Sequence, residues 1–184
     1  VSCVGWGSPG SAFSGDGAYN IIRDSVSVNC TYGFSRVSDL LTASGCIIEN
    51  SPVNNGALSH GSKFSTISDT AVYNSGYGIA NVNGADGSGN TLTRVAMYHS
   101  QAMIGPACNH NLLRSCTAIK STTAGFVNGN SGSDATLIGC TASNNTTANF
   151  SATAQDVVML NCTNQSALAP VSSYLAVNVG MASA

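Results

Sequence analysis

One pattern recurs along most of the chain at intervals of 21 to 25 residues. Each copy has a small or compact residue at a shared reference position: Cys3, Ser25, Cys46, Thr70, Val95, Cys116, Cys140 and Cys162. An apolar residue such as Leu113 or Leu137 stands three positions before it in most copies, and Asn often follows four positions after it. Repeats this short belong to stacked architectures, because one unit cannot bury its apolar side without its neighbours.

The residue types within each copy favour strands over helices. Helical repeats need about 30–47 residues and good helix formers. These copies are instead rich in β-branched residues, Asn, Gly and Ser, which have low helix propensity. The sequence also lacks the Leu-x-x-Leu-x-Leu run of leucine-rich repeats. We therefore predict an all-β fold, a right-handed single-stranded parallel β-helix (a solenoid) of about eight coils, with equivalent residues stacked about 4.8 Å apart.

The repeat also suggests how the chain is organised. We expect residues 1–167 to form the β-helix coils, with an incomplete first coil that continues a longer solenoid. Residues 168–184 depart from the repeat and alternate apolar with small side chains. This pattern indicates a capping segment or an oligomerisation segment.

The seven cysteines include no Cys-x-x-Cys pair, so we predict neither a metal site nor a cofactor from them. Stacked cysteines would be close enough for a disulfide, but side chains that point the same way rarely meet its dihedral angle. Cysteine also serves well as a small buried apolar residue. We therefore predict free, buried thiols.

Composition excludes two classes of partner. Only 8% of the residues are charged, against about 25% in an average globular chain, and the net charge is −2. Without a cluster of Lys and Arg to neutralise phosphates, we expect no binding to nucleic acid. No apolar run approaches the roughly 20 residues of a membrane-spanning helix, so we expect no membrane insertion.

The best-formed copy of the repeat, residues 111–126, has the pattern Asn-x-Leu-x-x-Cys-x-Ala-x-x-Ser-x-x-x-Gly-Phe. This pattern resembles the pectate-lyase-type parallel β-helix superfamily, and most of all the β-helix domains of bacteriophage tailspike depolymerases. The resemblance implies a homotrimer, on a virion tail or extracellular, that binds or cuts a bacterial surface polysaccharide. The Arg-x-Pro-x-x-Arg motif of pectate lyases is absent, so no catalytic residue can be carried over from it.

Candidate catalytic residues come from the alignment of the copies. Asp24 and Asp69 both precede the reference position by one residue, with Gly45 at that place in the copy between them. Two coils correspond to about 9.6 Å, near the separation of about 6.5–9.5 Å between the carboxyl groups of inverting glycoside hydrolases. Glu49 belongs to the intervening copy and is the third candidate.

Candidate substrate-binding residues are Arg94, one copy after Asp69, and the stacked pair Tyr73 and Tyr98. Tyrosine rings offer flat apolar faces with a polar end, on which a sugar can rest. Two simpler interpretations stay open. Asp69 and Arg94 can form a solvent-screened ion pair, and the tyrosines can merely cover the sheet.

Three functions follow from these observations. The first is a tailspike-like β-helix that recognises a polysaccharide and depolymerises it. The second is a non-catalytic rod or spacer of a virion fibre or a secreted adhesin. The third is a bacterial polysaccharide lyase or epimerase. If the protein is an enzyme, we expect a glycoside hydrolase or a polysaccharide lyase.

Overall fold

The computed structural model describes residues 2–15, 19–37, 40–51, 58–59, 63–79, 88–104, 108, 110–126, 135–146 and 157–164. Within these ranges every extended regular element is a β-strand, and no helix occurs. The strands form three sheets, named here A, B and C, and every pairing between neighbouring strands is parallel. The predicted C-terminal segment 168–184 lies outside the described residues.

Each sheet collects one strand from successive coils, so its members come from well-separated parts of the sequence. Sheet A contains β1 (Val4–Trp6), β4 (Val26–Val28), β7 (Ile47–Glu49), β10 (Ala71–Tyr73), β13 (Ala96–Tyr98), β16 (Thr117–Ile119), β18 (Thr141–Ser143) and β20 (Thr163–Asn164). Sheet B contains β2 (Ser11–Gly15), β5 (Tyr32–Val37), β8 (Leu58–Ser59), β11 (Tyr77–Ile79) and β14 (Ala102–Ile104). Sheet C contains β3 (Ile21–Arg23), β6 (Thr42–Ser44), β9 (Thr66–Ser68), β12 (Thr91–Thr93), β15 (Asn111–Arg114), β17 (Ala135–Ile138) and β19 (Val157–Leu160).

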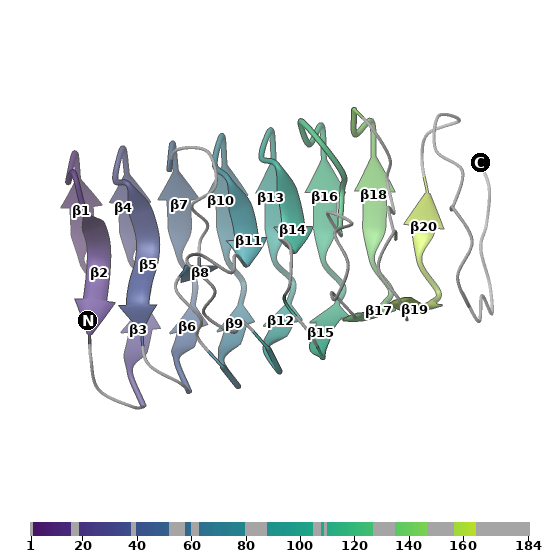
Figure 1. Ribbon diagram of the computed structural model, residues 1–184, viewed down its shortest axis with the longest axis horizontal. Helices are drawn as coiled ribbons and strands as arrows, with labels where there is room; N and C mark the ends of the chain where they lie inside the picture. Colours follow the sequence, from purple (N-terminus) through teal and green to yellow (C-terminus); the bar gives the residue numbers. More distant parts are fainter. Residues whose placement is uncertain are drawn as a thin grey trace.

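The strands stack along the long axis of the molecule, from β1 at one end towards β20 at the other (Figure 1). Along the chain, a strand of sheet C leads into a strand of sheet A, and in several coils a strand of sheet B follows. This order is that of a parallel β-helix. The predicted all-β parallel β-helix is confirmed.

The turn from sheet C to sheet A is made by one residue in the left-handed backbone region. These corner residues have φ between 49° and 64° and are Asp24, Gly45, Asp69, Arg94, Ser115, Gly139 and Asn161. Gly adopts this conformation without a steric penalty, and Asp and Asn tolerate it better than most residues. The corner also continues the sheet, because the Asp24 N–H donates to the Ser44 carbonyl at 2.9 Å.

A column of polar side chains inside the corner before sheet C satisfies buried backbone groups. The backbone N–H of Ser65 donates to Asn90 Oδ1 at 2.9 Å, and the Asn90 N–H donates to Asn111 Oδ1, also at 2.9 Å. One coil earlier, the Leu41 N–H donates to Ser65 Oγ at 3.1 Å. All four residues are buried. Such pairing removes the cost of leaving N–H groups in a dry interior without an acceptor.

The core is built from columns of apolar side chains that point inward from the three sheets. In sheet C the column includes Ile67, Leu92, Leu113 and Leu137, each of which has at most 1% of its surface exposed. The strands of sheet B bring further large apolar residues into register: Phe13 is paired with Phe34, with ring centroids 5.7 Å apart. In the backbone pairing Ile79 is the partner of Ile104. Phe126 is fully buried, whereas Phe150 lies outside the described residues.

All seven cysteines lie within the described residues and none of them forms a disulfide, as predicted. Cys3 is exposed and the other six are buried. The expectation that equivalent cysteines stack is confirmed for Cys116 and Cys140, because the Thr141 N–H that follows Cys140 donates to the Cys116 carbonyl at 2.9 Å.

Candidate functional site

The corner between sheets C and A carries the two predicted catalytic aspartates. Asp24, Gly45 and Asp69 follow one another in this corner column, as the sequence predicted, because the Asp24 N–H binds the Ser44 carbonyl and the Gly45 N–H binds the Ser68 carbonyl. Asp24 leans over the glycine: a Cβ placed on Gly45 would lie 2.5 Å from Asp24 Oδ1. The missing side chain of Gly45 thus makes room for the Asp24 carboxylate.

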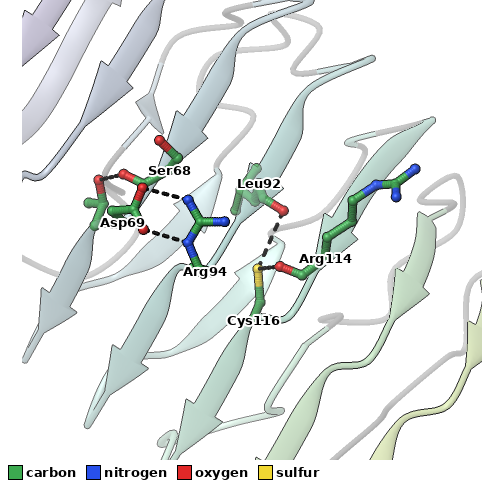
Figure 2. Close-up of polar contacts among 7 residues, drawn as sticks. Ser68, Asp69, Leu92, Arg94, Arg114 and Cys116 are labelled. Atoms are coloured by element: carbon green, nitrogen blue, oxygen red, sulfur yellow. Dashed lines mark hydrogen bonds and ion pairs between the residues drawn. The ribbon is translucent and has the colours of Figure 1, made fainter.

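Asp69 reaches towards the next coil, as Asp24 does, and there binds Arg94 with both carboxylate oxygens. Arg94 Nε donates to Asp69 Oδ1 at 2.6 Å and Arg94 Nη2 donates to Oδ2 at 2.8 Å. Figure 2 shows the two side chains facing each other on the surface, with Arg114 pointing away from them. The side chains of Arg94 and Asp69 are 60% and 49% exposed, respectively. The ion pair that the sequence left open as an alternative is therefore formed.

This ion pair favours the charged forms of Asp69 and Arg94. The hydrogen bonds from Arg94 hold the pKa of the Asp69 carboxyl below its ordinary value, and the same contact raises the pKa of Arg94. Asp69 is therefore ionised at neutral pH, as a carboxyl with its ordinary pKa also is. An ionised carboxylate can accept a proton or attack as a nucleophile, but it cannot act as a general acid.

The two predicted tyrosines lie together on the outer face of sheet A. Tyr73 ends β10 and Tyr98 ends β13, and the two residues are direct partners in the sheet. Their ring centroids are 6.5 Å apart and the rings are tilted by 57°. Glu49, at the end of β7, is the partner of Tyr73 on the other side.

Two residues to which the sequence assigned no binding role complete this surface. The His99 ring packs edge-on against Tyr98 with centroids 4.7 Å apart, and Lys120 Nζ lies 5.6 Å from the centre of the Tyr98 ring. Both occupy the left-handed corner after sheet A, where Asn50 and Asn74 stand in earlier coils. In the sequence, the sign of this surface is that His99 and Lys120 stand where other copies of the repeat have Asn. We call Glu49, Tyr73, Tyr98, His99 and Lys120 the tyrosine surface.

Sheet A separates the predicted residues into two groups. Asp24, Asp69 and Arg94 precede its strands, whereas Glu49, Tyr73 and Tyr98 end them. From Asp69 to Tyr73 the chain advances four residues, or about 13 Å of extended backbone. The structure thus brings Glu49 together with the tyrosines and places it across the sheet from the aspartates.

The described part of the chain shows neither a multidentate metal centre nor a membrane-spanning helix. No group of three or more His, Cys, Asp or Glu side chains in it is arranged to hold a metal ion. Among the same residues, no helix has the length and hydropathy needed to cross a bilayer.

Comparison with known proteins gave no relative. The chain matches no protein-family model, no curated protein and no solved structure.

Proposed function

We propose that the protein is a polysaccharide-binding β-helix and that the sugar chain lies along the tyrosine surface. The observation that carries this proposal is the in-register pair Tyr73 and Tyr98, bordered by the carboxylate of Glu49. Aromatic rings bind the apolar faces of sugars, and neighbouring polar groups bind their hydroxyls. In the chain as a whole only 8% of the residues are charged, which also suits a ligand recognised by stacking and hydrogen bonds.

Within this surface the two tyrosines have different roles. Lys120 lies over the Tyr98 ring and His99 packs on its side, so Tyr98 is held in place by protein groups. Tyr73 is 41% exposed and has the more accessible ring. We assign Tyr73 as the main stacking platform, with Tyr98 as its support.

The polar residues beside the tyrosines favour an extended ligand. Asn29, Asn50 and Asn74 occupy the corner after sheet A in successive coils and are exposed. Asn50 Nδ2 donates to Asn29 Oδ1 at 3.0 Å, which aligns these amides along the molecule. A row of amides that continues from the tyrosine surface fits the hydroxyls of several linked sugars better than those of one.

The resemblance of the repeat to tailspike β-helices supports a more specific form of the proposal. In this form the ligand is a bacterial surface polysaccharide and the protein works as a homotrimer on a virion tail or outside the cell. Chemical cross-linking and the mass of the particle in solution test the trimer.

The binding experiment uses a panel of purified capsular and O-antigen polysaccharides. We expect Tyr73→Ala to weaken binding about tenfold, which corresponds to 1.4 kcal/mol and to the loss of one stacking contact. Tyr19→Ala is the matched control, because Tyr19 is exposed but lies next to sheet C. Equal binding by the two variants would refute the site. The absence of any bound polysaccharide would favour the rod or spacer.

A second candidate function, depolymerisation, rests on the corner column. Asp69 is ionised at neutral pH, as the general base of an inverting hydrolase must be, and its ion pair with Arg94 holds the carboxylate in place. Asp24, two coils away, would then be the acid, while Glu49 is too distant to join them. We expect Asp69→Asn to abolish release of reducing ends with little change in melting temperature. Cleavage by this variant would exclude the pair, and products absorbing near the ultraviolet band of unsaturated uronates would indicate a lyase.

A further inference from the structure

One interior column follows the corner between sheets C and A and contains the reference position of each copy. The type of residue in this column changes along the molecule. In the earlier coils it holds mixed compact residues, among them Ser25, Cys46, Thr70 and Val95. In the last three described coils it holds only cysteines: Cys116, Cys140 and Cys162. Their exposed fractions are 0%, 0% and 1%. We call these three residues the thiol column.

The three thiols lie in direct succession. The Thr141 N–H donates to the Cys116 carbonyl at 2.9 Å and the Thr163 N–H donates to the Cys140 carbonyl at 2.8 Å, so the three backbones are in register. Each thiol also donates a weak hydrogen bond to backbone carbonyl oxygens. For example, Cys116 Sγ lies 3.5 Å from the Leu92 carbonyl oxygen (Figure 2).

We propose that the thiol column binds soft, two-coordinate metal ions of the Cu(I), Ag(I) and Hg(II) class between successive sulfurs. A metal–thiolate bond is about 2.3 Å long in zinc sites, so two such bonds in line span about 4.6 Å. Successive strands of a sheet lie about 4.7–4.9 Å apart. The spacing of the coils therefore equals the span of a linear sulfur–metal–sulfur unit.

The direction of the side chains suits the same unit. The cysteines project into the interior, across the stacking direction, so an ion between two sulfurs meets each carbon–sulfur bond at nearly a right angle. That angle directs a sulfur lone pair at the ion. The parallel projection that disfavours a disulfide thus favours a bridging ion.

Charge and coordination number select the class of ion. A tetrahedral zinc site needs four ligands, and the described residues offer no converging group of even three. Thiolates prefer soft ions such as Cu(I). On binding, each thiol that becomes a thiolate releases its proton to solvent, so Hg(II) with two thiolates is uncharged. Because an uncompensated charge in the core is costly, Hg(II) is the probe expected to bind most tightly.

The same interior column supplies a matched control. Cys46 is as deeply buried as the thiol column, with 1% of its surface exposed. Its neighbours in the column are Ser25 and Thr70, whose oxygens are poor ligands for a soft ion. If burial alone caused binding, Cys46 would bind as well as Cys140.

The experiment uses the full chain with Cys3→Ser, which removes the exposed thiol. The reduced protein is incubated with Hg(II) chloride without oxygen, freed of excess ion, and examined by native mass spectrometry and X-ray absorption. We expect bound Hg(II) with two sulfur neighbours and a raised melting temperature, since an ion that binds only the folded state stabilises it. Cys140→Ser removes this signal, whereas Cys46→Ser keeps it.

Several outcomes would overturn the proposal. They are retention of two-sulfur Hg(II) by Cys140→Ser, its loss in Cys46→Ser, or no such species in the Cys3→Ser protein. If Cys140→Ser does not fold, Cys140→Val takes its place, because Val95 already occupies this column. Cys162→Ser, which leaves Cys116 and Cys140 as a pair, should still bind one ion. The site is independent of polysaccharide binding, so neither result decides the other.

Discussion

Replacing Asn90 tests whether the polar column inside the corner before sheet C stabilises the fold. Asn90 is fully buried, and its Oδ1 accepts the backbone N–H of Ser65 at 2.9 Å. In Asn90→Ala this N–H keeps its place in the interior but loses its acceptor. An unsatisfied buried donor costs about 1–3 kcal/mol, and we expect the free energy of unfolding to fall by that amount.

Urea denaturation measures this change. The midpoint should fall while the slope stays constant, which indicates that stability changed and the extent of unfolding did not. Hydrogen exchange gives a local check, because the amide of Ser65 should lose protection more than the amide of Leu41, which has its own acceptor in Ser65 Oγ.

Asn90→Ser is the matched variant. Ser65 occupies the preceding position of this column and accepts the Leu41 N–H through its hydroxyl at 3.1 Å. A serine at position 90 should therefore recover part of the lost stability. A loss below about 0.5 kcal/mol in Asn90→Ala, the range of ordinary surface substitutions, would refute the reasoning, as would an equal loss in the serine variant.

Two further predictions concern the corner between sheets C and A. Gly139→Ala forces alanine into a left-handed conformation with φ of 60°, in a place where its Cβ would meet Ser115 Oγ only at an ordinary 3.9 Å, so unfolding by urea should show a loss of about 1–2 kcal/mol. Gly139→Asn should lose less, and equal losses would contradict this cause. Arg94→Gln should return the pKa of the Asp69 carboxyl towards its ordinary value in an NMR titration, because the Arg94 hydrogen bonds now lower it. A lowered pKa stabilises the folded state at pH values above the unfolded-state pKa, and this stability is lost as the pH falls through the folded-state pKa. The free energy of unfolding of Arg94→Gln should therefore change less between neutral and acid pH than that of the original protein. An unchanged titration of Asp69 would exclude the ion pair in solution.

The alignment of residues between coils could be predicted from the sequence, but their lateral position on the surface could not. The repeat aligned Asp24 with Asp69 and Tyr73 with Tyr98, because stacked coils require equivalent residues at equivalent positions. It did not show that Glu49 lies across sheet A from the aspartates. That separation depends on how many extended residues lie between the two corners of a coil.

The register of sheet B shows a second limit. In the backbone pairing Leu58 is the partner of Phe34 and of Ile79, although the spacing of the repeat did not identify it. The connecting segments between sheets A and B vary in length, so counting residues from the reference position loses the register there. Strand pairing, which depends on backbone hydrogen bonds between coils, restores it.

A period of 21 to 25 residues with recurrent compact residues permits few folds other than a stack of short parallel strands, so the architecture and the inward-facing cysteines could be predicted from the sequence. Which side chains touch one another became known only from the arrangement of the coils in space. The Asp69 carboxylate binds Arg94, and Lys120 lies over Tyr98. Such contacts depend on the rotamers of side chains on neighbouring coils, and the order of residues along one coil does not specify them.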